Sequence, residues 1–201
     1  TAGPYVNFIL QKNEIIKDVI KEVGKKRESY GRDKNGRNKK IMLEFSNGNT
    51  HKELHIGHLR NICLGDSLTK ILAANGFRSL PISYINDFGV HVAKTLWVYS
   101  EFYKNDPLPE NKGYFLGKIY VKACQELEKD PASNATVNFI MKKIESRQGE
   151  EYKLWQKTRE WSIEQFAKIY DELNVKFVKT FYESDVIDEG QKIVKKLLRE
   201  G

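Results

Sequence analysis

The sequence predicts an α/β fold in which a parallel sheet carries a mostly helical insertion. Two short apolar runs, Ile41–Phe45 and Leu80–Ile85, have the length of buried strands. Between them, apolar residues recur at helical spacing from about His55 to Asn75, where Asn75-Gly76 is typical of a helix end. Strand, helix and strand in this order form a βαβ unit, whose strands are parallel. We expect the first strand to be central and the helix to pack on it.

The segment before the first strand is predicted to be a helix followed by a loop. Apolar residues at helical spacing indicate an amphipathic helix from about Phe8 to Val23, ended by Gly24. Glycines and asparagines among charges in Lys25–Lys40 are typical of a loop.

The segment after the second strand is predicted to be largely helical, from Phe88 to Glu172, and forms the expected insertion at about 88–173. Proline-containing breaks interrupt it at Asp106–Pro109 and Asp130–Pro131. A weakly alternating stretch, Val175–Phe181, is predicted to be a third strand, and a final helix spans Ile187–Leu198.

Composition limits the class of protein. The 201 residues are 40% hydrophobic and 30% charged, and no apolar run approaches the roughly 20 residues that a membrane span needs. Cys63 and Cys124 have no paired spacing, which fits a reducing cytoplasm. Ten of the Lys and Arg residues, against four Asp or Glu, fall between Lys17 and Lys40. Such a stretch indicates either contact with nucleic-acid phosphates or a solvated helix and loop, and charge alone leaves both open.

The turn from the first strand into the helix carries the residues that indicate chemistry. In open α/β sheets, ligands bind outside the carboxyl ends of the strands, and a helix N-terminus favours a phosphate group. His55 and His58 begin the helix three residues apart, so both imidazoles can reach one triphosphate. Gly57 lies between them and lets a flat base approach the backbone. This arrangement suits stabilisation of charge on an α-phosphate during nucleotidyl transfer.

The stretch from Glu44 to Asn61 resembles the HIGH signature of class I aminoacyl-tRNA synthetases, with His55-Ile56-Gly57-His58 at its centre. Its longer pattern, E-F-S-x-x-N-x-x-K-x-x-H-x-G-H-L-R-N, is similar to the arginine-specific family. Further segments share the resemblance, namely Gly65-Asp66, Tyr84–Asp87, Ala2–Leu10 and Trp155–Tyr182.

The resemblance implies a Rossmann-like parallel sheet of the class I synthetase, HUP-type nucleotide-binding fold, with a mostly helical insertion. It also implies an arginine–tRNA ligase that adenylates arginine with ATP and Mg²⁺ and transfers it to the 3′ end of tRNA-Arg. The family's pattern places Lys52, His55, Gly57 and His58 at ATP, with His55 and His58 as the catalytic pair. It places Glu44, Ser46 and Asn49 at the arginine substrate. We expect a cytoplasmic monomer with no protein-bound metal.

The resemblance also implies how the chain is divided. Residues 1–30 correspond to the end of, or the linker from, an N-terminal tRNA-binding domain, and residues 31–201 to the front part of the catalytic domain. The second class I signature, a K-M-S-K-like loop, is not in the sequence. We therefore expect a fragment that is catalytically silent alone.

Two positions depart from the family's pattern, and other interpretations stay open. Gly48 stands where many members have proline, and His91 replaces a glutamine, so no role is carried over to His91. His51 and His55 have the i, i+4 spacing of helical zinc ligands, but no glutamate follows the first histidine. The histidines could also be ordinary residues at a helix start. The whole chain could belong to another class I synthetase, to a nucleotidylyltransferase, or to a non-catalytic tRNA-binding module.

Overall fold

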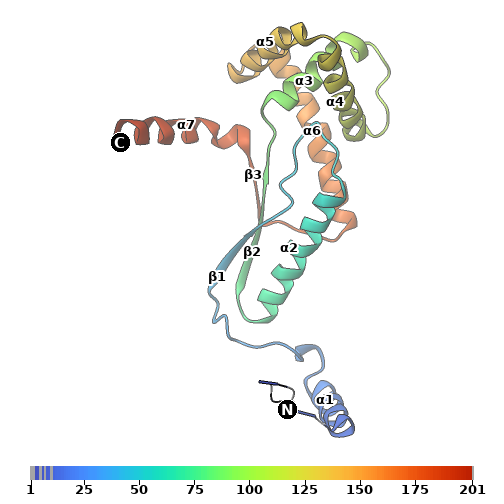
Figure 1. The fold of residues 1–201 in the computed structure, drawn as a ribbon, viewed down its shortest axis with the longest axis vertical. Helices are drawn as coiled ribbons and strands as arrows, with labels where there is room; N and C mark the ends of the chain where they lie inside the picture. Colours follow the sequence, from blue (N-terminus) through green and yellow to red (C-terminus); the bar gives the residue numbers. More distant parts are fainter. Residues whose placement is uncertain (1–2, 5, 7, 10, 201) are drawn as a thin grey trace.

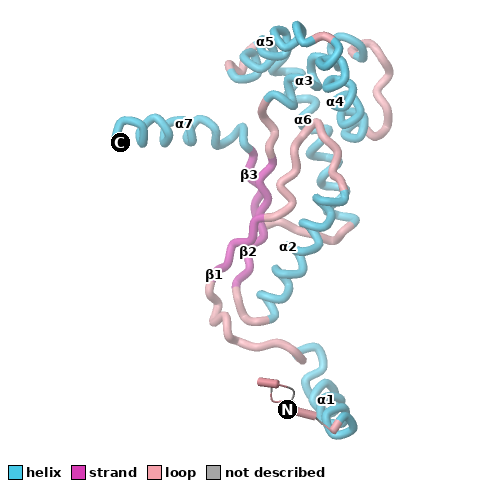
Figure 2. Tube along the Cα trace, viewed as in Figure 1, coloured by secondary structure: helices cyan, strands magenta, loops and turns pink. Residues whose placement is uncertain are grey.

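A three-stranded parallel sheet forms the middle of the structure (Figures 1 and 2). This computed structural model describes residues 3–4, 6, 8–9 and 11–200. The strands are β1 (Lys40–Glu44), β2 (Arg78–Ile85) and β3 (Lys179–Tyr182), in the order β1-β2-β3. Both pairings are parallel, which confirms the predicted βαβ unit.

The prediction that the first strand is central is wrong for this sheet, because β2 lies between the other two strands. β1 is an edge strand of five residues that alternate between exposed and half-buried, and Met42 is 66% exposed. β2 is longer, and its second half is mostly buried. β1 therefore has the alternating exposure of a strand covered on one face, rather than the full burial that its apolar sequence predicted.

Helix α2 (Ile56–Ala74) crosses back beside β1 and β2, with Asn75 as its C-cap and Gly76 at φ +80°. This agrees with the predicted helix within one residue at each end. Phe45, Ile62 and Val175 form a small buried core. This core joins the end of β1, helix α2 and the segment before β3.

The segment between β2 and β3 is mostly helical, as predicted (Figure 1), and it has a core of its own. Its elements are α3 (Val90–Val98), the π-helix η2 (Tyr99–Tyr103), α4 (Lys112–Lys129), the 3₁₀-helix η3 (Pro131–Ser133), α5 (Asn134–Glu145) and α6 (Gly149–Glu172). Both predicted proline-containing breaks fall between helices or at a helix end. The longest helix, α6, reaches from this unit back toward the sheet (Figure 1).

The two terminal helices make few contacts with the rest of the chain (Figure 2). Helix α1 (Lys12–Lys26) starts later than predicted and continues through Gly24, and the 3₁₀-helix η1 (Arg27–Ser29) follows. Part of the N-terminal segment Ala2–Leu10 lies outside the described residues. Helix α7 (Glu183–Glu200) begins directly after β3 and has no buried residue. None of the described helices is long and apolar enough to cross a membrane.

Candidate functional site

The loop that follows β1 lies against the end of β2, so residues far apart in the sequence meet at the carboxyl ends of the strands. Asn49 pairs with Asn86 as a parallel bridge. The Thr50 N–H donates to the Asn86 carbonyl at 3.0 Å, and the Asn86 N–H donates to the Gly48 carbonyl at 3.1 Å. The loop is thereby tied to the sheet before it leads into α2. This edge of the sheet is the position at which ligands bind in α/β folds.

His55 and His58 close the first turn of α2 with a reciprocal capping arrangement. His55 is the N-cap, and its Nδ1 accepts from the Gly57 N–H at 3.0 Å. In return, His58 Nδ1 accepts from the His55 N–H at 3.2 Å. The ring centroids lie 4.1 Å apart. A helix start can bind a phosphate through its backbone N–H groups, but here those of Gly57 and His55 are occupied by the two rings.

This capping fixes the tautomer of both rings. A ring nitrogen that accepts a hydrogen bond carries no proton, so in a neutral imidazole the proton must sit on the other nitrogen. Burial, followed by the nearby His55, lowers the pKa of His58, which keeps its ring neutral near pH 7. Each Nε2 is therefore an N–H donor on the side of its ring opposite the helix backbone. Two such donors beside each other suit the oxygens of a phosphate group.

Gly57 gives the His55 ring the space it needs. A Cβ at this position would lie 2.8 Å from His55 Cε1 and 3.0 Å from His55 Nδ1. The missing side chain thus has a local role in the cap, beside the predicted role at the base of ATP, which stays a prediction.

His51 is a structural residue within the loop. It is fully buried, and its two ring nitrogens lie 2.9 Å from Thr50 Oγ1 and 2.8 Å from Thr158 Oγ1. Burial lowers its pKa to about 3. Both nitrogens are engaged by hydroxyl groups, which does not fit a zinc ligand paired with His55. The described residues contain no group of three His, Cys, Asp or Glu side chains that could hold a metal ion.

Lys52 lies half-buried between the buried His51 and the cap, and its ammonium faces an aromatic ring. Its Nζ is 4.5 Å from the centroid of Tyr120, a residue of α4. Lys52 also affects His91. Burial, and then the charge of Lys52, lower the pKa of His91 to about 4. His91 is therefore neutral near pH 7 and leaves the positive charge on Lys52.

The residues predicted to bind arginine lie at the end of β1 in three different environments. Glu44 is exposed and accepts from Asn47 Nδ2 at 2.9 Å. Ser46 is 4% exposed, with φ +75°, and its hydroxyl lies 2.7 Å from the hydroxyl of Tyr170. Asn49 is half-buried. Their roles toward arginine remain predictions, and the Ser46 hydroxyl already has a protein partner.

Three carboxylates lie near the end of β2. Tyr84, near the end of that strand, has its pKa raised by burial and then by the negative charges of Glu183, Asp87 and Glu44. Glu44 is the last residue of β1, Asp87 follows β2, and Glu183 follows β3. Asp87 is paired with Arg159, so the carboxylates of Glu44 and Glu183 make the negative field that suits a cationic ligand.

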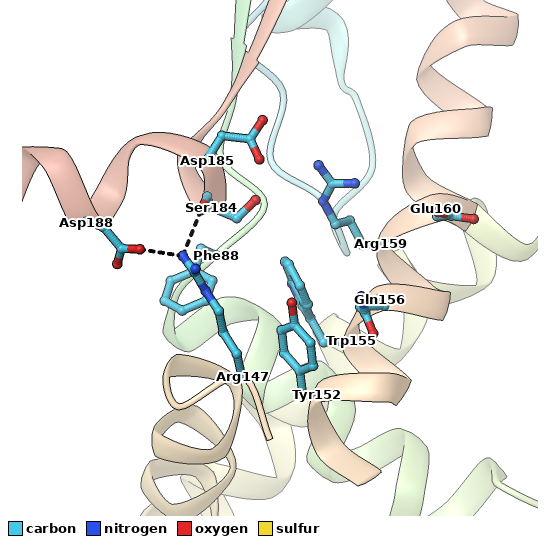
Figure 3. A pocket seen from close by; sticks show the side chains of 10 residues that line it. All are labelled: Phe88, Arg147, Tyr152, Trp155, Gln156, Arg159, Glu160, Ser184, Asp185 and Asp188. Atoms are coloured by element: carbon cyan, nitrogen blue, oxygen red, sulfur yellow. Dashed lines mark hydrogen bonds and ion pairs between the residues drawn. The ribbon is translucent and has the colours of Figure 1, made fainter. Parts of the chain in front are cut away.

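Asp87 holds the end of β2 to the helices on either side. Its buried carboxylate pairs with Arg159 Nε of α6 and accepts from the N–H and Oγ of Ser184, at 2.9 Å and 2.7 Å. Its carbonyl accepts from Trp155 Nε1 at 2.8 Å. Beside this network lies a cavity of about 420 Å³ lined by α6 and the start of α7 (Figure 3). Figure 3 shows the stacked rings of Tyr152 and Trp155 on one side and Arg147 joined to Asp188 on the other.

A family model described as the catalytic domain of class I (R) tRNA synthetases matches residues 19–201. The chain belongs to this family. Arginine–tRNA ligase of Borrelia hermsii is 37% identical over 203 residues, which cover 99% of the chain and 35% of that relative. Arginine–tRNA ligase of Clostridium botulinum is 34% identical over 197 residues, with 98% and 35% covered. The chain thus spans about a third of the length of these relatives.

The fold agrees with this membership of the class I (R) family. Thermus thermophilus arginyl-tRNA synthetase superposes with a TM-score of 0.66 at 27% identity, over 98% of the chain and 32% of that structure. The class I α/β fold is therefore confirmed.

The sequence did not reveal the residues of this synthetase domain that reach the site from distant parts of the chain. Tyr120 and Arg159 come from the helical segment and meet Lys52 and Asp87 only in the folded chain. Neither residue belongs to a local sequence pattern. A buried carboxylate at the end of a strand, such as Asp87, does require a cationic partner, but the sequence does not show which residue it is.

Proposed function

We propose that the chain forms part of an arginine–tRNA ligase, which activates arginine with ATP and transfers it to the 3′ end of tRNA-Arg. The observation that carries this is the cap of α2, which presents the Nε2–H groups of His55 and His58 side by side. Negative charge grows on the α-phosphate as the arginine carboxylate attacks it. Two preorganised donors stabilise that charge more in the transition state than in the ground state.

The remaining roles follow the same edge of the sheet. Lys52 binds the ATP phosphates, and Gly57 lies under the adenine. Glu44 and Asn49, with Ser46 in support, hold the arginine. The carboxylates of Glu44 and Glu183 near Tyr84 support binding of a cationic substrate, because they create a negative field at the strand ends. We expect Mg²⁺ to arrive with the ATP phosphates.

Three broader features belong to the same proposal. Residues 1–30 lead from a tRNA-binding domain, and residues 31–201 form the front of the catalytic domain with its insertion at about 88–173. The protein works in the cytoplasm, where its tRNA is used. It acts as a monomer.

ATP–pyrophosphate exchange by the full-length protein, with each amino acid and with or without tRNA, tests the proposal. Exchange that depends on arginine supports it. Exchange with another amino acid would point to a different synthetase, and silence with all of them to a tRNA-binding module.

Variants of the cap separate its structural and chemical roles. His55→Ala and His58→Ala should each slow exchange about 10²-fold, the scale of one lost transition-state donor, and should leave the KM for arginine nearly unchanged. Asparagine is a good N-cap but lacks the distant donor, so His55→Asn should preserve stability and still lose activity. Lys70→Ala, at an exposed ion pair further along α2, is the control and should behave as wild type. Full activity in His55→Asn would contradict the assignment.

A further inference from the structure

Lys52 contacts a residue of the helical segment. None of the ion pairs in the described part of the chain involves Lys52. Its Nζ instead lies 4.5 Å from the ring centroid of Tyr120. A cation over a tyrosine face is attracted by the ring quadrupole and keeps its charge.

Tyr120 is carried by a well-packed helix. It lies on α4 next to Ile119 and four residues after Leu116, both of which are almost completely buried in the core of the helical segment. Because protein cores are closely packed, a helix with two such buried residues has little freedom to shift. The backbone that carries the half-buried Tyr120 is therefore held in place beside the lysine.

Helix α4 also packs closely against the loop residue that follows Lys52. A Cβ at Gly117 would lie 2.8 Å from Glu53 Oε1. The absence of a side chain at Gly117 thus lets the helix approach the loop. Tyr120, one turn later, comes over the lysine because of this approach.

His91, which the charge of Lys52 affects, does not compete for the ammonium. Burial and the charge of Lys52 lower the pKa of His91 to about 4, so this ring is neutral near pH 7. A lysine has several rotatable bonds, and holding one conformation costs conformational entropy. An aromatic face offsets that cost without neutralising the ammonium, which a carboxylate would do.

We propose that Tyr120 is a positioning residue for ATP binding, whose ring holds the Lys52 ammonium in the orientation that meets the nucleotide phosphates. This inference rests on the proposed role of Lys52. It places one determinant of nucleotide affinity in the helical segment, outside the signature region. Tyr120 touches the lysine and not the reacting atoms.

The first test compares the KM for ATP and for arginine in arginine-dependent exchange by the full-length protein. Tyr120→Leu should raise the KM for ATP roughly three- to tenfold, the scale of one lost cation–π contact, and leave the KM for arginine unchanged. Tyr120→Phe keeps the ring and should stay within about twofold of wild type. Tyr114→Leu is the matched control, because Lys118 Nζ lies 4.6 Å from the Tyr114 ring on the same helix. It should change neither constant.

A double-mutant cycle excludes a general loss of folding. Lys52→Met removes the cation, so adding Tyr120→Leu to it should cause no further rise in the KM for ATP. Equal effects of Tyr120→Leu in both backgrounds would show a structural role and overturn the proposal. An unchanged KM for ATP in Tyr120→Leu alone would overturn it as well.

A second readout separates this inference from the proposed function. If the wild-type protein shows no arginine-dependent exchange, the proposed function fails, and ATP binding is measured by equilibrium dialysis on the same variants. Weaker ATP binding by Tyr120→Leu, absent in the Lys52→Met background, still supports the positioning role. Equal binding by wild type and Tyr120→Leu overturns it.

Discussion

The replacement Asp87→Asn tests whether the buried network at the end of β2 holds the sheet to the helical segment. The side chain keeps its shape but loses its charge. The carboxylate accepts three hydrogen bonds, one from Arg159 and two from Ser184. An amide can accept with its oxygen only, so its NH₂ group must face a donor, and Arg159 loses its counter-charge.

The cost follows from burial. The Asp87 side chain is 0% exposed and that of Arg159 is 18% exposed. Removing one partner of a buried pair costs about 3–5 kcal/mol, and the remaining exposure of Arg159 places this case near about 3 kcal/mol. With a denaturant slope of about 2 kcal/mol per molar urea, the unfolding midpoint should fall by about 1.5 M.

Urea unfolding followed by circular dichroism measures this shift. Asp188→Asn is the control, because its pair with Arg147 is exposed on both sides, at 51% for Arg147 and 62% for Asp188. Breaking that pair should cost less than about 1 kcal/mol. A midpoint for Asp87→Asn no lower than that of Asp188→Asn would refute the reasoning.

Three further changes probe the loop and the cap. The pKa of His51 is about 3 in the folded state against 6.5 for the unconstrained group, so below pH 6.5 only the unfolded chain takes up this proton. The contribution of His51 to stability should therefore fall by about 1.4 kcal/mol per pH unit toward pH 4, beside a similar contribution from His91, and urea midpoints at pH 7.5 and 5 should show a weaker dependence in His51→Gln. Gly57→Ala should displace the His55 ring, costing about 1 kcal/mol in thermal unfolding and slowing exchange, whereas wild-type exchange rates would show that the cap tolerates a Cβ. Tyr170→Phe removes the hydrogen bond to Ser46 and should destabilise by about 1 kcal/mol in the same urea assay, with no effect expected if solvent replaces the lost partner.

The parts of the fold that local sequence determines were predicted well. Helix α2 has regular apolar spacing and an Asn-Gly end, so its boundaries agree within one residue. β3 was predicted at Val175–Phe181 but spans Lys179–Tyr182. Val175 is buried against Phe45 without pairing in the sheet, and burial in a loop leaves the same apolar signal as burial in a strand.

The candidate site shows the same division between local and long-range determinants. The histidine pair was recognised because its residues stand three positions apart in the sequence, but its capping geometry was not, since capping boxes normally use Ser or Thr with Glu or Gln. The contact of Lys52 with Tyr120 and the pair of Asp87 with Arg159 depend on how the helical segment packs on the sheet. Charge and spacing within a segment do not encode such contacts.

The capping arrangement shows what imidazoles offer at this helix start that other polar side chains do not. Serine, threonine and aspartate place an acceptor where a helix start requires one, but they offer no donor further out. The amides of asparagine and glutamine carry donor and acceptor on the same carbon, so both point into one region. Only the imidazole ring holds an acceptor near the backbone and a donor on its far side in a single rigid plane. A helix whose first turn is closed by His55 and His58 thus uses the inner nitrogen of each ring for its own backbone, and the outer nitrogen is the donor that the proposed phosphate binding requires.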